Sequence, residues 1–558
     1  MAAAGFLWTA SLGLLVVLAF APGWCAPCER LLSGVPEFAE NFRVIRLEAH
    51  EAAQEYSTLL VNLNNKQVYA LADKDKYAQA DNTSQLFAVP EMDVQAILSL
   101  LQSGGVQLQD PATSSSEADN TSSSATNSSD IGMNETDFSI VGVRVPLTSI
   151  TVDETQLIPY VEALGAMDTI VLATPYLSSP CLQQQAENFL AQSGEEGATN
   201  SSEADLASET SSPWLAEGLL QVGEAQGGRG AMADMVRFVG GYGGDGDDYA
   251  IQFAPSSELG EGSALAASEW IKFFAPLFQK DCEAQEMFEE VRRRYLCHQE
   301  KAQNMAFASS LSDEDSIDDV VVGVTYFSEG YECDGCEYES PPKLVISGAK
   351  YFESYIEDAG GIALTKTLPP ADSGVTLANY SSGNDYEFVL DGNNTEPIEA
   401  FKGVLKGVDV LIDISFFPAG EEVAGESVLN KVLSSYGLIN GTDGTDGWNE
   451  TLGDEYPFVK NQLLWRVDRR MSGLADGGWD WFESRYPRAD VLLEDMIYAI
   501  HPEYKTEFLN DPSHELTWMR NLFDEGNNDQ VFLTSEMCDD ESVSVLQLVA
   551  DECSVIRS

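Results

Sequence analysis

The sequence has little positive charge. Among its 558 residues, 30 are Lys or Arg and 91 are Asp or Glu, which gives a formal net charge of −61. Nucleic acids and anionic membranes are bound through clustered Lys and Arg side chains, and an excess of carboxylates is repelled by both. The composition therefore excludes nucleic acid and anionic membrane surfaces as partners.

Residues and motifs typical of catalysis are also scarce. The only histidines are His50, His298, His501 and His514, and neither G-x-S-x-G nor HExxH is present. The loop GGYGGDGDD at 240–248 has no Lys and is not a phosphate loop; we interpret it as a flexible acidic loop, with a calcium site as the alternative. We expect no enzyme activity. A carbohydrate hydrolase that uses two of the many carboxylates remains the alternative class.

Long apolar runs are absent after the first 25 residues. Residues 1–25, MAAAGFLWTASLGLLVVLAFAPGWC, hold a short apolar core followed by small residues and proline. This pattern predicts a secretory signal peptide and is too short for a spanning helix. We therefore expect a secreted or cell-surface protein. AFAP at 19–22 suggests plastid targeting as an alternative, which the acidic residues that follow disfavour.

Cysteines and glycosylation sequons agree with export. Nine cysteines occur, and cleavage after Cys25 would leave eight, an even set suited to disulfides. We interpret CDGC at 333–336 as disulfide-forming, because no second CxxC or nearby His completes a zinc site. Nine N-x-Ser/Thr sequons predict glycosylation at Asn82, Asn120, Asn127, Asn134, Asn200, Asn379, Asn393, Asn440 and Asn449.

The rest of the chain alternates β-rich runs with amphipathic stretches. Hydrophobic residues make up 44% of the sequence and aromatics 10%, enough for a packed core, and the length suggests two domains. Segments 110–137, 193–213 and 437–454 are rich in Ser, Thr, Asn, Gly and acids, so we interpret them as surface insertions. The alternation between them predicts an α/β fold with mostly parallel sheets.

The strands are predicted at eleven runs, and helices at 347–360 and 480–502, the second ending at a His-Pro. The eleven runs are STLLVNL, KQVYALA, FSIVGVRV, DTIVLAT, DMVRFVG, YAIQFA, DVVVGVTYF, KLVISG, YEFVLDG, VDVLIDISF and QLLWRVD.

One longer helix is predicted between the two sets of strands. From Leu265 to Cys297 the apolar positions, among them Trp270, Phe273 and Phe274, recur at intervals of three or four. A continuous helix of this length would extend about 50 Å at 1.5 Å per residue. We expect it to join two α/β halves, with Pro276 as a kink site. Cys282 and Cys297 would then lie about 22 Å apart along the helix, too far to form a disulfide with each other.

Four stretches resemble one known family, the bacterial solute-binding proteins that capture cobalamin, haem and iron siderophores. RVPLTSITVDETQLIPYVEALGAMDTIVLAT looks like the opening of that family's first lobe, and EWIKFFAPLFQKDCEAQEMFEEVRRRY is similar to its interlobe helix. GAKYFESYIEDAGG resembles the start of the second lobe, and WRVDRRMSGLADGGWDWFESRYPRADVLLEDMIYAIHPE resembles its end. The signal peptide, sequons and insertions are typical of a eukaryotic branch, such as the algal cobalamin acquisition proteins.

This resemblance implies two Rossmann-like lobes joined by a long interdomain α-helix. The implied division is a signal peptide at 1–25, an N-terminal lobe at 38–263, the helix at 264–297, a C-terminal lobe at 318–525 and a tail at 526–558. The implied function is capture of cobalamin or a related corrinoid by a monomer that hands it to a membrane receptor or transporter. An iron siderophore or haem is the alternative ligand.

The chain departs from the family pattern at three places. Asp153-Glu154 stands where relatives often have Ser-Thr, and Ala267 stands where many have Arg. The Glu that bacterial relatives use for docking on an importer has no clear counterpart ahead of Ala233-Asp234.

The ligand is expected in the cleft, against loops at the carboxyl ends of the strands. A corrin ring has a large apolar face, so aromatic side chains on those loops are the candidate contacts, although each taken singly is more often an ordinary core or loop residue. We interpret Trp479 and Trp481 as packing residues. The candidate ligand-binding residues are Asp153, Glu154, Thr155, Tyr176, Tyr242, Tyr326, Phe327, Phe416 and Phe417. No metal site or catalytic residue is predicted.

Overall fold

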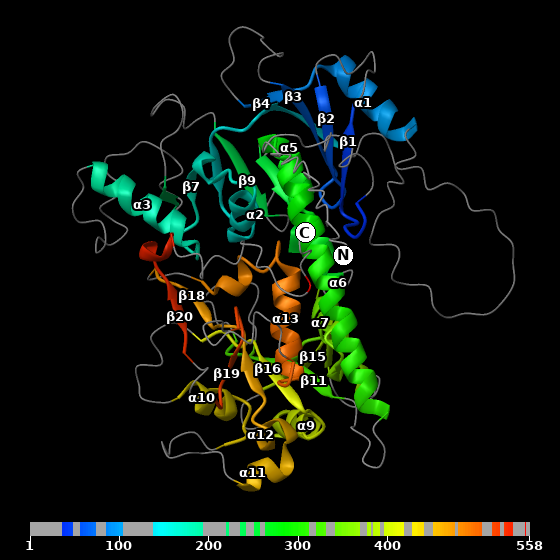
Figure 1. Cartoon of the computed structure of the whole chain (residues 1–558), viewed down its shortest axis with the longest axis vertical. Helices are drawn as coiled ribbons and strands as arrows, with labels where there is room; N and C mark the ends of the chain where they lie inside the picture. Colours follow the sequence, from blue (N-terminus) through cyan, green and yellow to red (C-terminus); the bar gives the residue numbers. More distant parts are fainter. Residues whose placement is uncertain are drawn as a thin grey trace, which may run out of the picture.

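Figure 1 shows a computed structural model of the protein. It describes residues 36–47, 56–73, 85–103, 138–193, 219–222, 235–240, 250–256, 263–311, 320–330, 341–368, 376–380, 383–390, 395–417, 427–439, 450–474, 478–504, 516–524, 529–539 and 553. We call residues 36–256 the N-terminal half and residues 320–524 the C-terminal half. Tyr242, Cys333, Cys336 and all the predicted sequons except Asn379 lie outside the described residues.

The N-terminal half contains two five-stranded sheets. The first sheet has the order β1-β2-β3-β5-β4 and the second has the order β10-β9-β6-β7-β8. The first comprises β1 Phe42–Arg46, β2 Tyr56–Asn62, β3 Gln67–Asp73, β4 Leu86–Ala88 and β5 Ser139–Val145. The second comprises β6 Ile150–Val152, β7 Ile170–Ala173, β8 Leu220–Gln221, β9 Val236–Gly240 and β10 Ala250–Phe253.

The C-terminal half is built on a third sheet, of order β14-β15-β12-β11-β16-β17-β19, with β13 paired to β11. Its strands are β11 Val321–Ser328, β12 Lys343–Ile346, β13 Ile362–Ala363, β14 Thr376–Tyr380, β15 Gly383–Val389, β16 Val410–Asp413, β17 Leu464–Arg466 and β19 Arg520–Asn521. A small parallel pair is formed by β18 Arg470–Ser472 and β20 Val531–Leu533. Asn379 lies in β14, opposite Asn384 of β15.

The fold is mixed α/β, and the expectation of mostly parallel sheets was wrong for two of the three large sheets. In the second sheet only the β7–β8 pair is antiparallel. In the first sheet only β3 and β5 run parallel, and the third sheet has antiparallel pairs on both sides of the parallel set β11-β16-β17. The physical reason is connection length: a four-residue link such as that between β2 and β3 reverses the chain, whereas a parallel crossover needs a dozen residues or more.

The helices of the described part cover these sheets. They are α1 Glu91–Ser103, α2 Ile158–Ala163, α3 Pro180–Ser193, α4 Ala264–Glu269, α5 Ile271–Phe278, α6 Asp281–Leu311, α7 Lys350–Asp358, α8 Leu364–Thr367, α9 Glu396–Leu405, α10 Val428–Ser435, α11 Glu450–Glu455, α12 Pro457–Lys460 and α13 Ala489–Ile500. Short 3-10 turns are η4 Thr155–Leu157, η5 Met167–Thr169, η12 Asp480–Phe482 and η13 Ser535–Met537. Each of the eleven predicted strands coincides with an observed strand, and α7 and α13 lie within the two predicted helical segments.

The predicted continuous helix over 265–297 is divided into α4, α5 and α6. The main break follows α5, where Gln279 takes a left-handed conformation with φ of 57°. The amide of Lys280 donates to the carbonyl of Ala275 at 2.9 Å, and that of Gln279 donates to the carbonyl of Pro276 at 3.4 Å. These two bonds form a Schellman motif, which ends a helix. Helix α6 then restarts at Asp281.

The aromatic stripe of this helical segment is buried against the N-terminal half. Trp270, Phe273 and Phe274 are all fully buried. The Trp270 ring lies 5.0 Å from Phe42 of β1, and the Phe274 ring lies 5.0 Å from Tyr160 of α2. Helix α6 continues past α7 and α13 of the C-terminal half, which it contacts (Figure 1). The stripe is therefore core structure, as its periodicity predicted.

Two disulfides attach the last part of the chain to earlier elements. Cys181 of α3 pairs with Cys538, and Cys297 of α6 pairs with Cys553. The prediction that Cys282 and Cys297 do not pair with each other is confirmed for Cys297. Strand β20, just before Cys538, pairs with β18 and adds a backbone connection to the C-terminal half.

Candidate functional site

The carboxyl end of β6 carries three of the predicted residues. Asp153 follows the strand, and its Oδ2 lies 2.5 Å from the guanidinium Nη2 of Arg237 on the adjacent parallel strand β9. Glu154 lies over Gly240, where an added Cβ would come within 3.0 Å of the Glu154 Cγ. Partial burial, and then the charge of Asp153, raise the pKa of Glu154. Thr155 begins η4 beside them.

Tyr176 lies in the loop after β7 and is 58% exposed. Backbone contacts attach this loop to the C-terminal half. The amide of Gly478 donates to the carbonyl of Tyr176 at 3.2 Å, and the Ser472 hydroxyl donates to the carbonyl of Leu177 at 2.7 Å. A loop of the second sheet and a loop of the C-terminal half thus meet at Tyr176.

Strand β16 ends next to this meeting point. Phe416 is 65% exposed, and its ring lies 5.8 Å from that of Trp479. The buried Trp479 ring stacks on Phe482, also at 5.8 Å, and Phe482 is 45% exposed. We call Tyr176, Phe416, Trp479 and Phe482 the aromatic junction. It brings together two loops that are separated by about 300 positions in the sequence, through the bond from the Gly478 amide to the Tyr176 carbonyl and the ring contacts of Trp479.

Tyr326 and Phe327, at the end of β11, are half-buried and lie deeper than Phe416. The Tyr326 hydroxyl donates to Asp385 at 3.4 Å, and Phe327 packs against the core of the third sheet. The amide of Phe327 donates to the Ser415 hydroxyl at 2.9 Å, which connects β11 to the loop after β16. This bond fixes the loop that carries Phe416 to the end of β11.

Buried ion pairs lie beneath Phe417 and Trp479. The Arg466 guanidinium lies 5.0 Å from the ring centre of Phe417 and 5.2 Å from that of Trp479. It pairs with Asp413 and, at 2.8 Å, with Asp468. Burial raises the pKa of Asp413, although the positive charge of Arg466 acts to lower it. Burial also opposes ionisation of Asp468, but Arg466 and then Arg520 lower its pKa below the ordinary value. The rings of Phe417 and Trp479 therefore pack on the buried Arg466 guanidinium, whose charge is paired with the carboxylates of Asp413 and Asp468.

A second buried cation, Arg485, lies beside Phe482. Its guanidinium carbon is 4.7 to 5.7 Å from four ring centres, and the residue is 5% exposed. The four rings belong to Tyr351, Trp481, Phe482 and Tyr486. Within the part of the chain that the structure describes, its Nη1 has no hydrogen-bond partner. This nitrogen is buried from solvent.

The sequence analysis missed Phe482 and Arg485. Both belong to the stretch GGWDWFESRYP, in which the sequence predicts a packing role for the two tryptophans, Trp479 and Trp481. That assignment is confirmed for Trp481, which is buried between Phe352 and Trp518. A single turn of chain thus presents one tryptophan to the core and a phenylalanine to the surface, a difference that composition does not reveal.

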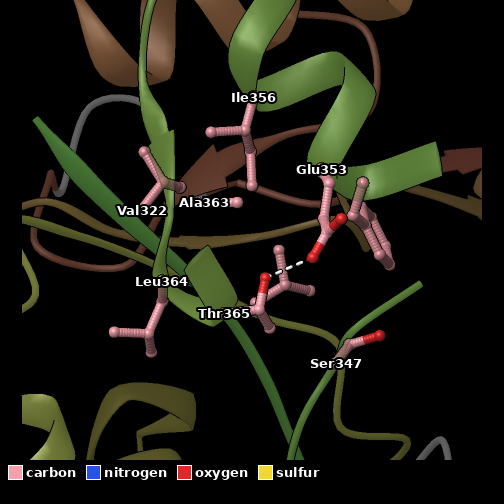
Figure 2. A pocket seen from close by; sticks show the side chains of 9 residues that line it. Val322, Ser347, Glu353, Ile356, Ala363, Leu364 and Thr365 are labelled. Carbon is pink, nitrogen blue, oxygen red and sulfur yellow. Dashed lines mark hydrogen bonds between the residues drawn. The ribbon is translucent and has the colours of Figure 1, made fainter. Parts of the chain in front are cut away.

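A separate small pocket lies in the C-terminal half between β11, α7 and α8 (Figure 2). Figure 2 shows the Glu353 carboxylate accepting a hydrogen bond from the Thr365 hydroxyl, among apolar side chains that include Val322 and Ile356. Its cavity volume of about 10 Å³ is far below the roughly 300 to 1,000 Å³ of typical ligand pockets. We do not assign it to the candidate site.

The described residues contain neither a cluster of metal-binding side chains nor a membrane-spanning helix. In these ranges, no group of three or more His, Cys, Asp and Glu side chains is placed to hold a metal ion. None of the helices described above is both long and apolar enough to cross a bilayer.

Comparison with known proteins gives weak structural likenesses. No family model and no curated protein matches the sequence. A periplasmic haem-binding protein from Pseudomonas aeruginosa is 12% identical, over 64% of this chain and 94% of its own, with a TM-score of 0.34. An ABC-type Fe3+-hydroxamate transport system from Saccharomonospora viridis is 14% identical over the same shares, also with a TM-score of 0.34. The periplasmic haem-binding protein RhuT from Roseiflexus is 14% identical, over 63% and 98%, with a TM-score of 0.31. At such TM-scores these likenesses carry no argument about this chain.

Proposed function

We propose that this chain is a solute-binding protein outside the cell that captures cobalamin or a related corrinoid at the aromatic junction, without catalysis. The observation that carries the proposal is the packing of two exposed aromatic side chains, Phe416 and Phe482, on the buried Trp479, next to the loop that carries the exposed Tyr176. Aromatic groupings on a surface indicate binding sites, and a corrin has a wide apolar face that would cover them. The bound ligand would then pass to a membrane receptor or transporter.

The proposal includes two α/β lobes, at 38–263 and 318–525, with residues 264–297 between them. Two packing observations support this division. Helix α5 contacts β1 and β5 of the N-terminal half, whereas α6 contacts α7 and α13 of the C-terminal half. The aromatic junction would lie where the lobes meet, at the carboxyl ends of β7 and β16, which is the usual position for ligands of α/β sheets.

Polar groups around the junction suit the periphery of a corrin. Cobalamin carries amide side chains and one phosphate, and it needs hydrogen-bond donors and acceptors around an apolar centre. The exposed carboxylate of Glu154 would supply an acceptor at the end of β6, and the buried Arg485 places a positive charge next to Phe482. We propose Asp153, Thr155 and Tyr242 as further contacts from the N-terminal half.

The test is direct titration of the purified, secreted glycoprotein. We expect cyanocobalamin to bind in a 1:1 complex, measured by calorimetry and by quenching of tryptophan fluorescence, and to be recovered unchanged. Haem and a ferric siderophore serve as competitors. If the protein retains neither cyanocobalamin nor hydroxocobalamin but binds haem or the siderophore tightly, the function is iron uptake and the corrinoid assignment is wrong.

A further inference from the structure

The two adjacent phenylalanines of the loop after β16 have different surroundings. Phe416 is 65% exposed, whereas Phe417 is half-buried and packs against the core of the third sheet. The residue before them, Ser415, is fully buried. The loop therefore presents one phenylalanine at the surface between two residues that face the interior.

Two cationic side chains lie at the Phe417 ring. The Nζ atom of Lys431, on α10, is 4.5 Å from the ring centre, and the guanidinium carbon of Arg466, on β17, is 5.0 Å from it. An aromatic ring attracts a cation, and the attraction is stronger where the pair is shielded from water, as it is for the buried Arg466. These contacts attach Phe417 to two separate elements of the C-terminal half.

Ser415, on the other side of Phe416, is also fixed. Its hydroxyl accepts the amide of Phe327 at 2.9 Å and donates to the Asp413 carboxylate at 2.5 Å. Its carbonyl accepts a hydrogen bond from the Arg466 guanidinium at 3.0 Å. The same guanidinium thus contacts the residue before Phe416 and the residue after it.

The surface on which Phe416 packs is held by this guanidinium as well. The Arg466 guanidinium carbon lies 5.2 Å from the ring centre of Trp479, and the Phe416 ring lies 5.8 Å from that of Trp479. Trp479 is buried. Arg466 therefore fixes Ser415, Phe417 and Trp479 relative to one another, and these three residues surround Phe416.

We infer that Phe417 is a positioning residue, which packs on the core and the two cations instead of touching the ligand and thereby holds Phe416 against Trp479. The ligand part of this inference rests on the proposed function. The sequence predicts a ligand contact at Phe417, and the packing gives it this different role. Because Phe417 acts through Phe416, its removal should affect binding only while the Phe416 ring is present.

The first experiment is a double-mutant cycle of cyanocobalamin affinity, measured by calorimetry on Phe416→Ala, Phe417→Leu and the double variant. Residues that act together give non-additive losses. We expect Phe417→Leu alone to lower the affinity about fivefold to tenfold, and to change it by less than about twofold in the Phe416→Ala protein. Phe417→Tyr keeps the aromatic ring and should bind nearly as the unmodified protein does. Equal losses in both backgrounds, or no loss in either, would overturn the inference.

The second experiment needs no ligand and follows the exposure of the Trp479 ring. Its fluorescence is obtained by subtracting the signal of the same variant carrying Trp479→Phe, and acrylamide serves as a neutral quencher. We expect acrylamide to quench Trp479 more efficiently in Phe417→Leu than in the unmodified protein, because Phe416 covers the ring less closely once its neighbour is loose. Phe417→Tyr should leave the quenching unchanged.

Phe388→Leu is the matched control, since it makes the same change in the same core. Phe388 of β15 is buried and packs on Phe401, with ring centres 5.3 Å apart. This variant should lower the melting temperature but alter neither cyanocobalamin affinity nor Trp479 quenching. If it reproduces both effects of Phe417→Leu, those effects come from general weakening of the core and the inference is overturned.

The two experiments separate the inference from the proposed function. If neither the unmodified protein nor any variant binds cyanocobalamin, but Trp479 quenching rises in Phe417→Leu and not in Phe388→Leu, the positioning role is supported and the proposed ligand is wrong. If Trp479 quenching is the same in Phe417→Leu and the unmodified protein, Phe417 does not hold Phe416 in place.

Discussion

Individual aromatic residues in this protein divide into buried and exposed sets with different expected roles. Trp270, Phe273 and Phe274 are fully buried and pack on β1, β3 and α2. Phe416 and Phe482 expose about half or more of their surface. The free-energy cost of truncating a side chain depends on how much packed surface is lost. Truncation in the buried set should therefore lower stability, and truncation in the exposed set should lower ligand affinity.

Trp270→Ala tests the buried set. Loss of a large buried aromatic side chain costs about 3 to 5 kcal/mol, a large part of the roughly 5 to 15 kcal/mol that stabilises a typical domain. We expect a lower melting temperature and a lower secreted yield, while the correctly folded fraction keeps its cyanocobalamin affinity. Normal stability combined with lost binding would instead assign Trp270 to the ligand site.

Phe416→Ala is the counterpart on the aromatic junction. Because Phe416 is 65% exposed, its removal should change the free energy of unfolding by less than about 1 kcal/mol. Aromatic side chains at the centre of binding sites contribute about 2 kcal/mol or more, so cyanocobalamin affinity should fall more than tenfold in calorimetric titration. Unchanged affinity would remove Phe416 from the site.

At the scale of elements, the helical segment 264–311 is interrupted by the backbone conformation of one residue, although its apolar periodicity continues. Its apolar spacing continues through α4, α5 and α6, yet the chain leaves the helical conformation at Gln279. Pro276 lacks an amide hydrogen and clashes with the preceding turn, which favours termination within one turn. The positive φ of Gln279 completes that termination and gives α6 its own starting point.

Gln279→Gly tests this account of the break. A residue with a side chain is disfavoured in the left-handed conformation, whereas glycine adopts it freely, so we expect the free energy of unfolding to rise by about 0.5 to 1 kcal/mol in denaturant titration. Glu286→Gly, at an exposed position inside α6, is the control and should lower it by about 1 kcal/mol. Destabilisation by both would mean that Gln279 lies within a continuous helix in solution.

At the scale of the whole molecule, the last described residues connect elements that are far apart in the sequence. The disulfides Cys181–Cys538 and Cys297–Cys553 span 357 and 256 positions, and β20, just before Cys538, pairs with β18. Cross-links over long stretches restrict the unfolded chain strongly. The C-terminal segment therefore fixes α3 near the C-terminal half, on the side that carries the Tyr176 loop.

The double variant Cys181→Ser/Cys538→Ser tests this attachment. Removal of a native disulfide typically costs about 2 to 5 kcal/mol, so we expect a clear fall in melting temperature under non-reducing conditions. Peptide mapping of the unmodified protein should recover both cystine pairs. Recovery of a Cys282–Cys297 pair would contradict the position of both residues on α6.

The sequence by itself determined the α/β class, the positions of the eleven predicted strands and the burial of the aromatic stripe. These features follow from local patterns, namely β-branched runs and apolar residues every three or four positions, which report on neighbours along the chain. The carboxyl ends of β7 and β16 were also located correctly, and with them Tyr176 and Phe416. Strand direction was not, because it depends on how each connection crosses the sheet.

Only the tertiary structure decided which of these residues lie together. Phe482 joins Phe416 through Trp479, and Glu483 reaches Ser178 across 305 positions of sequence. Arg485 and Arg466 are both buried arginines in the same region, and only their surroundings distinguish them: Arg485 lies among four aromatic rings, whereas Arg466 pairs with two carboxylates. Such relations arise from long-range packing, because no local pattern fixes the distance between segments separated by hundreds of residues.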